Sequence, residues 1–138
     1  MSVVGMARRR AHPYDVDLEL RDRGAAALSA TTAQDPIELI VGANDVFKVV
    51  VNYGAISGTV DGSNNWTVNV QISDEVGGTY QTIATTGVLQ AAAGQVELSV
   101  TGLKADYLES DAGFIRAQAV RVGTPGNLSY GAFITTVM

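Results

Sequence analysis

The sequence predicts an all-β protein, an antiparallel two-sheet sandwich of the immunoglobulin-like or jelly-roll kind with an extended N-terminal arm. Several short segments alternate apolar and polar residues, the pattern of a strand with one buried and one solvated face. Turn signals rich in glycine recur roughly every eight to twelve residues, a spacing typical of sandwiches and barrels. No segment has a strong helical period. We expect residues 1–14 to form the arm and residues 15–138 a single domain.

The composition fits a many-turned β domain that needs no cofactor. The chain has 138 residues, 46% of them hydrophobic, enough for one core without metals or cross-links. The absence of cysteine excludes disulfides, thiol catalysis and thiolate metal sites. No apolar run is long enough to span a bilayer and no signal-peptide pattern is visible, so we expect synthesis in a cytoplasm without export by that route.

The charge is distributed unevenly along the chain. Residues 1–14 hold Arg8, Arg9 and Arg10 and no acid, a formal charge of +3, whereas residues 24–138 hold four basic against ten acidic residues, a formal charge of −6. An acidic body is a poor ligand for nucleic acid or an anionic membrane, so we expect neither as a specific partner. The arm is either a frayed terminus or a segment that docks on a neighbouring chain through arginine–carboxylate contacts. An arginine cluster can also contact nucleic acid, but three residues are too few to favour that alternative over the other two.

The first half of the chain contains three predicted strands before its clearest hairpin. They span residues 15–20, 36–41 and 46–53, and the last is the most apolar and is expected at the centre of a sheet. Residues 21–24 form a predicted turn, and residues 25–32 are expected to be extended. The glycine-rich connection 54–64 leaves room for a short strand at 56–60.

Residues 65–84 form the predicted hairpin around which the chain is organised. Trp66, Val68, Val70 and Ile72 share one parity, so they face the core, with Trp66 anchoring the packing between sheets. The paired glycines at 77–78 can take the positive φ that tight hairpins need, and a second strand follows at 79–83.

The C-terminal third contains three further predicted strands. Residues 95–101 alternate with Val96, Leu98 and Val100 inward. Residues 113–122 and 127–137 are expected to pair with each other across a type II turn, in which Pro125 presets φ and Gly126 takes a positive φ.

No catalytic, cofactor-binding or metal-ligating constellation is visible. His12 is the only histidine and lies in the arm, where a base for nucleophilic catalysis is not rigidly held. Residues 61–65 superficially resemble a calcium loop, but the spacing lacks the full signature and a trailing glutamate, so a polar hairpin loop is favoured.

Two groups of side chains are candidates for binding instead of chemistry. Trp66, Tyr53, Tyr80 and Tyr130 form either a stacking platform for a sugar or, as is more common on alternating strands, core and strand-end packing. The second group is Arg116 and Arg121, which occupy opposite parities of one strand. Each meets an acid or a neighbouring subunit, or lies on an ordinary solvated face.

The succession NWTVNVQISDEVGGTYQTIATTGVLQAAAGQVELSV, followed by GFIRAQAVRVGTPGNLSYGAFI, resembles small β-sandwich virion proteins of tailed bacteriophages. These include decoration, or cement, proteins that bind the outside of the capsid. The shared phrases are a V-x-V-Q-x-S-D strand leading to a G-x-T-Y strand, and a later F-I-R-A strand that runs into a turn at Gly123. The resemblance covers residues 46–134.

The resemblance implies a non-enzymatic virion structural protein on the capsid surface. Its expected partners are the major capsid protein and further copies of itself, with a trimer favoured. Arg8, Arg9 and Arg10 are the expected partner-binding residues, because capsid-associated proteins often lace neighbours together with such arms. The alternative function is a carbohydrate-binding or tail-associated adhesion domain.

Overall fold

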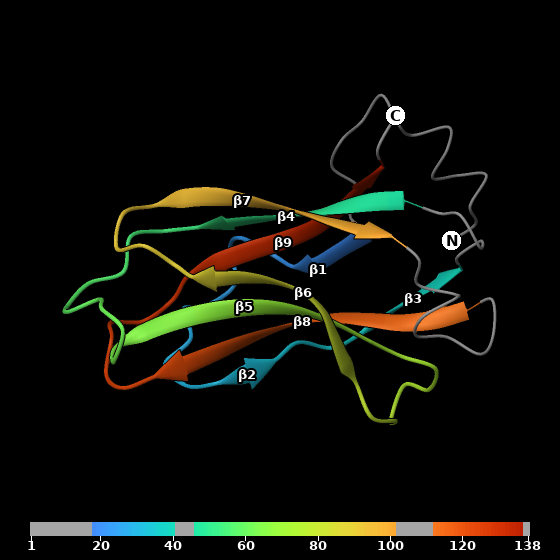
Figure 1. The fold of residues 1–138 in the computed structure, drawn as a ribbon, viewed down its shortest axis with the longest axis horizontal. Helices are drawn as coiled ribbons and strands as arrows, with labels where there is room; N and C mark the ends of the chain where they lie inside the picture. The colour runs from blue at the N-terminus through green and yellow to red at the C-terminus, as the bar shows by residue number, and fades with distance from the viewer. Residues whose placement is uncertain (1–17, 41–45, 102–111, 137–138) are drawn as a thin grey trace.

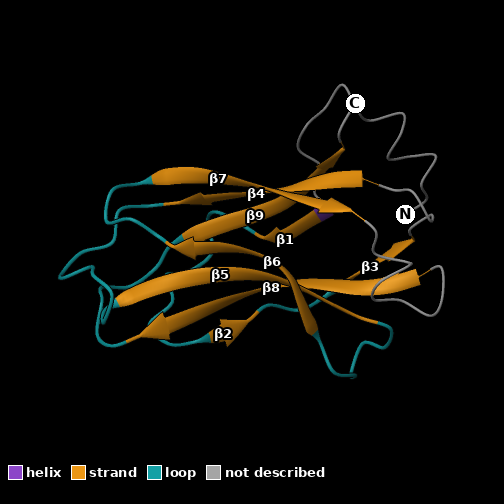
Figure 2. Cartoon of the chain, in the orientation of Figure 1, coloured by secondary structure: helices purple, strands orange, loops and turns teal. Residues whose placement is uncertain are grey.

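The computed structural model describes residues 18–40, 46–101 and 112–136, and these residues form a sandwich of two antiparallel sheets (Figure 1). Figure 2 shows that the described elements are almost all strands and loops. The strands are β1 (Glu19–Arg21), β2 (Thr32–Ala33), β3 (Ile37–Ile40), β4 (Val46–Tyr53), β5 (Asn65–Ser73), β6 (Gln81–Val88), β7 (Gly94–Thr101), β8 (Ala112–Val122) and β9 (Tyr130–Thr136). The described residues include no helix that is long and apolar enough to cross a membrane.

The strand order is that of a jelly roll. One sheet has the order β1-β9-β4-β7, and the other has the order β2-β8-β5-β6, with β3 also paired to β8. Counted with β2 and β3 as one interrupted strand, the first strand pairs with the last, the second with the second-last, and so on inward. This is the double Greek-key arrangement of a jelly roll. The predicted two-sheet sandwich is therefore confirmed, and of the two topologies considered the jelly roll is the one observed.

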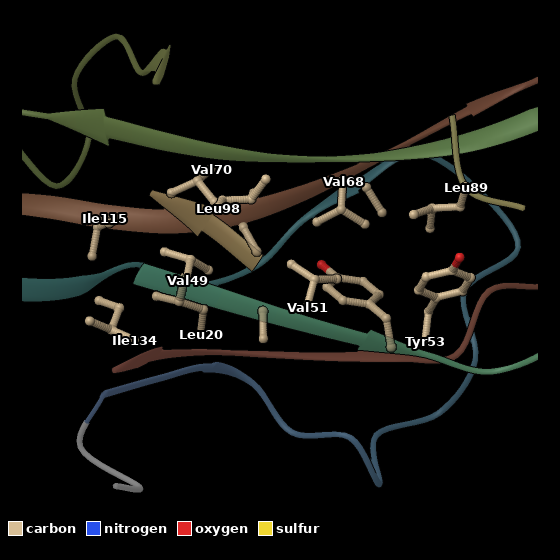
Figure 3. Packing of buried hydrophobic residues seen from close by; sticks show 14 of the residues in the cluster. Leu20, Val49, Val51, Tyr53, Val68, Val70, Leu89, Leu98, Ile115 and Ile134 are labelled. Atoms are coloured by element: carbon tan, nitrogen blue, oxygen red, sulfur yellow. The ribbon is translucent and has the colours of Figure 1, made fainter. Parts of the chain in front are cut away.

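The core lies between the sheets and is built from the alternation that the sequence shows. Figure 3 shows Val68 and Val70 of β5 facing Val49 and Val51 of β4 across the sandwich. Each of these four side chains is fully buried. Because the register of β4 with β7 and with β9 is regular over its length, β4 is a central strand, as predicted.

The predicted pairing of residues 113–122 with residues 127–137 is wrong. β8 pairs with β5, whereas β9 pairs with β1 and β4, so the connection between them crosses from one sheet to the other. β8 and β9 each bury one face in the same core. The crossing places the two strands in opposite sheets, so that their buried faces both line this core, whereas a hairpin would place both strands in one sheet. The positive φ is found at Gly123 (φ 69), not at Gly126.

Several local boundaries also differ from the sequence-based expectation. β1 begins at Glu19 and takes in Arg21, which had been placed in the turn, and residues 15–17 lie outside the described part of the chain. Residues 56–60 form no strand, although Ile56 is buried in the core. The hairpin of β5 and β6 is confirmed, but neither of its paired glycines has a positive φ.

The connections β4–β5 and β8–β9 lie at the same end of the sandwich and are joined there (Figure 1). The Trp66 indole N–H donates to the Gly126 carbonyl oxygen at 2.8 Å, and the Gly126 N–H donates to the Ser57 carbonyl oxygen at 2.8 Å. The Asn64 side-chain oxygen accepts the Thr124 N–H at 3.0 Å. These bonds fix the crossing between the sheets.

Truncation of Trp66 tests whether this residue anchors the core. The side chain is fully buried and satisfies its one donor, so Trp66→Ala should lower the free energy of unfolding by about 3–5 kcal/mol. Trp66→Phe leaves the Gly126 carbonyl without its donor but keeps an aromatic ring in the core. The free energy of unfolding should therefore fall by less than in Trp66→Ala. Denaturant unfolding measures both, and a Trp66→Ala loss below about 1 kcal/mol would contradict the assignment.

A pair of glycine substitutions tests the joined loops. A Cβ at Gly123 would lie 2.2 Å from the Ser63 carbonyl oxygen on a backbone of positive φ, whereas a Cβ at Gly62 meets nothing within 4 Å. Gly123→Ala should therefore destabilise the fold by more than about 1 kcal/mol, and Gly62→Ala should change it by less than about 0.5 kcal/mol. Equal effects in thermal melting would show that the loops are not joined as described.

Candidate functional site

The outer face of the five-stranded sheet carries a connected group of polar side chains. Gln71 of β5 lies directly opposite Arg116 of β8 on one side and Thr82 of β6 on the other. Gln118 lies one step along the same face of β8, opposite Asn69. Cross-strand partners on one face of an antiparallel sheet are close enough for their side chains to interact. We call Gln71, Tyr80, Thr82, Arg116 and Gln118 the polar face.

Gln71 is the centre of the polar face. Its side-chain oxygen accepts the Arg116 Nε–H at 2.9 Å, and its amide nitrogen donates to Gln118 Oε1 at 3.0 Å and to Thr82 Oγ1 at 3.3 Å. Although it points away from the core, Gln71 is only 8% exposed. Neighbouring side chains exclude water from the Gln71 amide, and their hydrogen bonds to it take the place of that water. These bonds hold the amide in one orientation.

Tyr80 closes one side of the polar face. The Arg116 guanidinium carbon lies 3.9 Å from the centre of the Tyr80 ring, a cation–π contact, and the Tyr80 hydroxyl donates to the Val76 carbonyl oxygen at 2.8 Å. Burial raises the pKa of Tyr80, and the nearby positive charge of Arg116 acts in the opposite direction. The phenol is therefore neutral at ordinary pH.

The loop between β5 and β6 folds back beside this group. The Ser73 hydroxyl donates to the Glu75 carbonyl oxygen at 2.8 Å, and a Cβ at Gly78 would lie only 2.8 Å from Ser73 Oγ. Gly78 is therefore required for close approach and not for positive φ. A polar depression of about 410 Å³ lies here, lined by the loop and by the ends of both strands.

The polar face is suited to binding. A guanidinium, two amides, a hydroxyl and a neutral phenol provide hydrogen bonds but no group that changes protonation near neutral pH. The terminal nitrogens of Arg116 have no hydrogen-bond partner among the described residues, while its Nε and its ring contact fix the direction in which they point. Such a group is prepared to donate to a carboxylate or carbonyl of a partner.

The structure gives no geometry for some of the residues that the sequence singled out. Arg8, Arg9, Arg10 and His12 lie outside the described residues. Asp61 is described, and its Oδ1 accepts the N–H groups of Ser63 at 2.8 Å and of Asn64 at 2.9 Å. These bonds lower the pKa of Asp61 and close the hairpin loop on itself. Within the described segments no three potential metal-ligating side chains are grouped together.

The aromatic residues do not form an exposed platform. Trp66 and Tyr130 are fully buried and Tyr53 is 8% exposed, so all three belong to the core. Tyr80 is half-buried and has Arg116 over its ring. The structure thus agrees with the packing alternative for these four side chains.

The two arginines of β8 have different roles. Arg116 joins the polar face, whereas the Arg121 Nη2 donates to the Pro125 carbonyl oxygen at 2.7 Å and supports the joined loops. Sequence analysis did not identify Gln71 or Gln118 as site residues. The polar parity of β5, together with the single residue between Arg116 and Gln118, was a signal that could have located them.

A second cation, Arg21, is almost fully buried beside Tyr130. Its guanidinium donates to the Tyr130 carbonyl oxygen, donates to the Ala26 carbonyl oxygen at 2.6 Å, and lies 4.6 Å from the centre of the Tyr130 ring. Burial lowers the pKa of Arg21. This contact ties the turn after β1 to β9 and is internal, so we regard it as structural.

The phenol of Tyr130 should make the fold sensitive to alkali. Burial raises the pKa of Tyr130 from 10.0 to about 12, although the charge of Arg21 opposes the shift. The stability due to the neutral phenol is fully present below the unfolded pKa and is lost as pH rises through the folded value. The two-unit shift corresponds to about 2–3 kcal/mol. Denaturant unfolding at pH 9 and pH 12 should show this loss in the wild type and a smaller one in Tyr130→Phe, and equal losses would contradict it.

No protein-family model and no curated protein matches this chain. The polar face, the fold and the resemblance of the strand phrases are therefore the observations from which a function is inferred.

Proposed function

We propose that this chain is a virion structural protein, a capsid cement or decoration protein that bridges and stabilises capsid subunits by non-covalent contacts. The observation that carries the proposal is the polar face, a fixed array of donors and acceptors built around Gln71 and Arg116 on the outer face of the five-stranded sheet. Its proposed partner is the major capsid protein. The proposal assigns the chain no enzymatic activity and no cofactor.

The composition of the polar face suits contact with a protein. Arginine and tyrosine are enriched among the residues that contribute most to protein interfaces, and side chains already fixed in the free protein lose little entropy on binding. Arg116 and Tyr80 fix each other, and Gln71 fixes Arg116. The Arg116 guanidinium is therefore already oriented before a partner carboxylate or carbonyl binds, and binding does not have to immobilise it.

The fold supports the same proposal. Jelly rolls recur in viral capsid domains and in lectins, so the fold fits both candidate functions, and the choice between them has to be argued from the site. The resemblance to small virion proteins runs through β4 to β9, the strands that form most of both sheets. Under this proposal the protein lies on the outer capsid surface and is made in the host cytoplasm.

Repeated copies would strengthen weak individual contacts. If the protein acts as a homo-oligomer, for which the resemblance to virion proteins favours a trimer, each copy raises the effective concentration of the others at the capsid. The arm with Arg8, Arg9 and Arg10 would add charge-assisted contacts to acids of a neighbouring subunit. The mechanism is geometric, because burying surface between adjacent capsid subunits opposes their separation.

The second candidate is carbohydrate binding, which the amides and hydroxyl of the polar face favour. Gln71, Gln118 and Thr82 are side chains that hydrogen-bond sugars well. The ring of Tyr80, however, is covered on one face by Arg116. A glycan-binding screen distinguishes this candidate from the first.

Co-sedimentation with capsids of the virus that carries the gene tests the proposal. Arg116→Ala removes the donor and should weaken binding by about fivefold or more, the effect of losing roughly 1 kcal/mol at an interface. Lys48→Ala removes the same charge from the outer face of the other sheet and should bind as the wild type does. No co-sedimentation of the wild-type protein, or equal losses in both variants, would contradict the proposed polar interface.

Deletion of residues 1–14 in the same experiment tests the arm. The sandwich should melt as before, because the deleted residues precede the described strands, while particle binding weakens, more so at high salt. Equal particle binding with and without the arm would show that it is a frayed terminus.

A further inference from the structure

The free edge of β7 differs from the other sheet edges that the structure describes. β1, β2 and β3 have only three, two and four residues, and β6 has two register shifts and a positive φ at Gly87. Short strands and bulges are devices by which natural proteins prevent an edge from pairing with another chain. β7 has eight residues, no proline and an unbroken register with β4.

The register identifies the backbone groups that β7 presents at this edge. The Gly54 N–H donates to the Ser129 carbonyl oxygen at 2.9 Å, which continues the β4–β9 ladder and directs the even-numbered residues of β4 toward β9. The odd-numbered residues therefore bond β7 through Gly94, Val96, Leu98 and Val100. The alternate β7 residues, Gln95, Glu97, Ser99 and Thr101, direct their N–H and C=O groups outward, where no described strand meets them.

We propose that β7 pairs with β7 of a second copy of this chain, antiparallel and around a two-fold axis at Leu98. In this register Glu97 lies opposite Ser99 of the other copy, and Gln95 lies opposite Thr101. Both are hydrogen-bonded pairs, because all four residues direct their backbone groups to the free edge. Val96 lies opposite Val100, so the inward apolar parity continues across the contact.

Charge selects this register over its neighbours. A shift by two residues in one direction places Glu97 opposite Glu97 of the other copy, and like charges directly opposite each other are destabilising. A shift in the other direction shortens the paired segment. A one-residue shift would place outward-directed groups opposite groups that already bond β4. The sequence of β7 is therefore complementary to itself in one alignment.

The surroundings of the edge are open to a second strand. The side chains of Gln95, Glu97 and Ser99 are exposed. A groove of about 400 Å³ runs beside the start of β7, and its lining includes Val96 and Val88, the latter 56% exposed. A strand laid along β7 would cover part of this groove, including the exposed side chain of Val88. The contact is isologous and closes with two copies, so it produces a dimer, and the expected trimer would require another surface.

Sedimentation analysis over a range of concentrations tests the pairing through charge. Ser99→Glu places a new carboxylate opposite Glu97 of the other copy at two symmetric positions, so dimerisation should weaken by about tenfold. Ser99→Lys places an ammonium there and should leave the dimer equal or tighter. Glu97→Lys combined with Ser99→Glu restores opposite charges and should recover the wild-type dimer.

Melting curves of the same variants separate assembly from folding. Ser99 lies beside Lys48 of β4 in its own chain, so a carboxylate at this position is favourable within the monomer and the fold should persist. A wild-type protein that stays monomeric at all concentrations would overturn the proposal. The proposal would also be overturned if the wild-type protein formed an oligomer whose affinity was the same in all three variants.

Discussion

The antiparallel pairing of β5 with β8 is the constraint on which the rest of the structure depends. The two strands stay in one register from Asn65 opposite Val122 to Ser73 opposite Phe114. Because side chains alternate between faces, this one register sends Trp66 into the core and Gln71 to the outer face beside Arg116. A slip of one residue would expose the apolar parity and bury the polar one, so the core and the polar face are specified together.

The same pairing positions the crossing between the sheets. Trp66 lies near one end of the β5–β8 ladder, and its indole N–H reaches the Gly126 carbonyl oxygen in the connection from β8 to β9. The chain therefore leaves one sheet and enters the other at a point held by the core itself. At the opposite end of β5, the loop to β6 carries Tyr80 back over Arg116. The proposed binding face is thus supported by rigid strands rather than by loops alone, which favours a prepared interface.

The alternation of apolar and polar residues predicted where the strands lie. Which strands pair with each other was seen only in the structure. The parities of Val46–Tyr53 and Asn65–Ser73 indicated correctly which side chains face the core, but Val50, Gln71 and Ser73 of the other parity are buried as well. The pairing of residues 113–122 with 127–137 was predicted wrongly, because local turn signals at Pro125 and Gly126 do not report whether a chain stays in one sheet. The polar face was missed for a related reason. Gln71 and Tyr80 are nine residues apart in the sequence, and only the folded loop places both of them against Arg116.

Residue-resolved hydrogen exchange on the dilute protein tests the central role of β5 and β8 most directly. Amides that open only on global unfolding exchange slowest, and the account places them at the centre of the β5–β8 ladder, at Asn69, Gln71 and Gln118, whose backbone groups face the partner strand. The β4–β7 and β4–β9 ladders should exchange at the same rate or faster. If amides of β5 and β8 exchanged by local opening while those of β4 and β9 stayed protected, the four-stranded sheet would be the stable unit and the account would be contradicted.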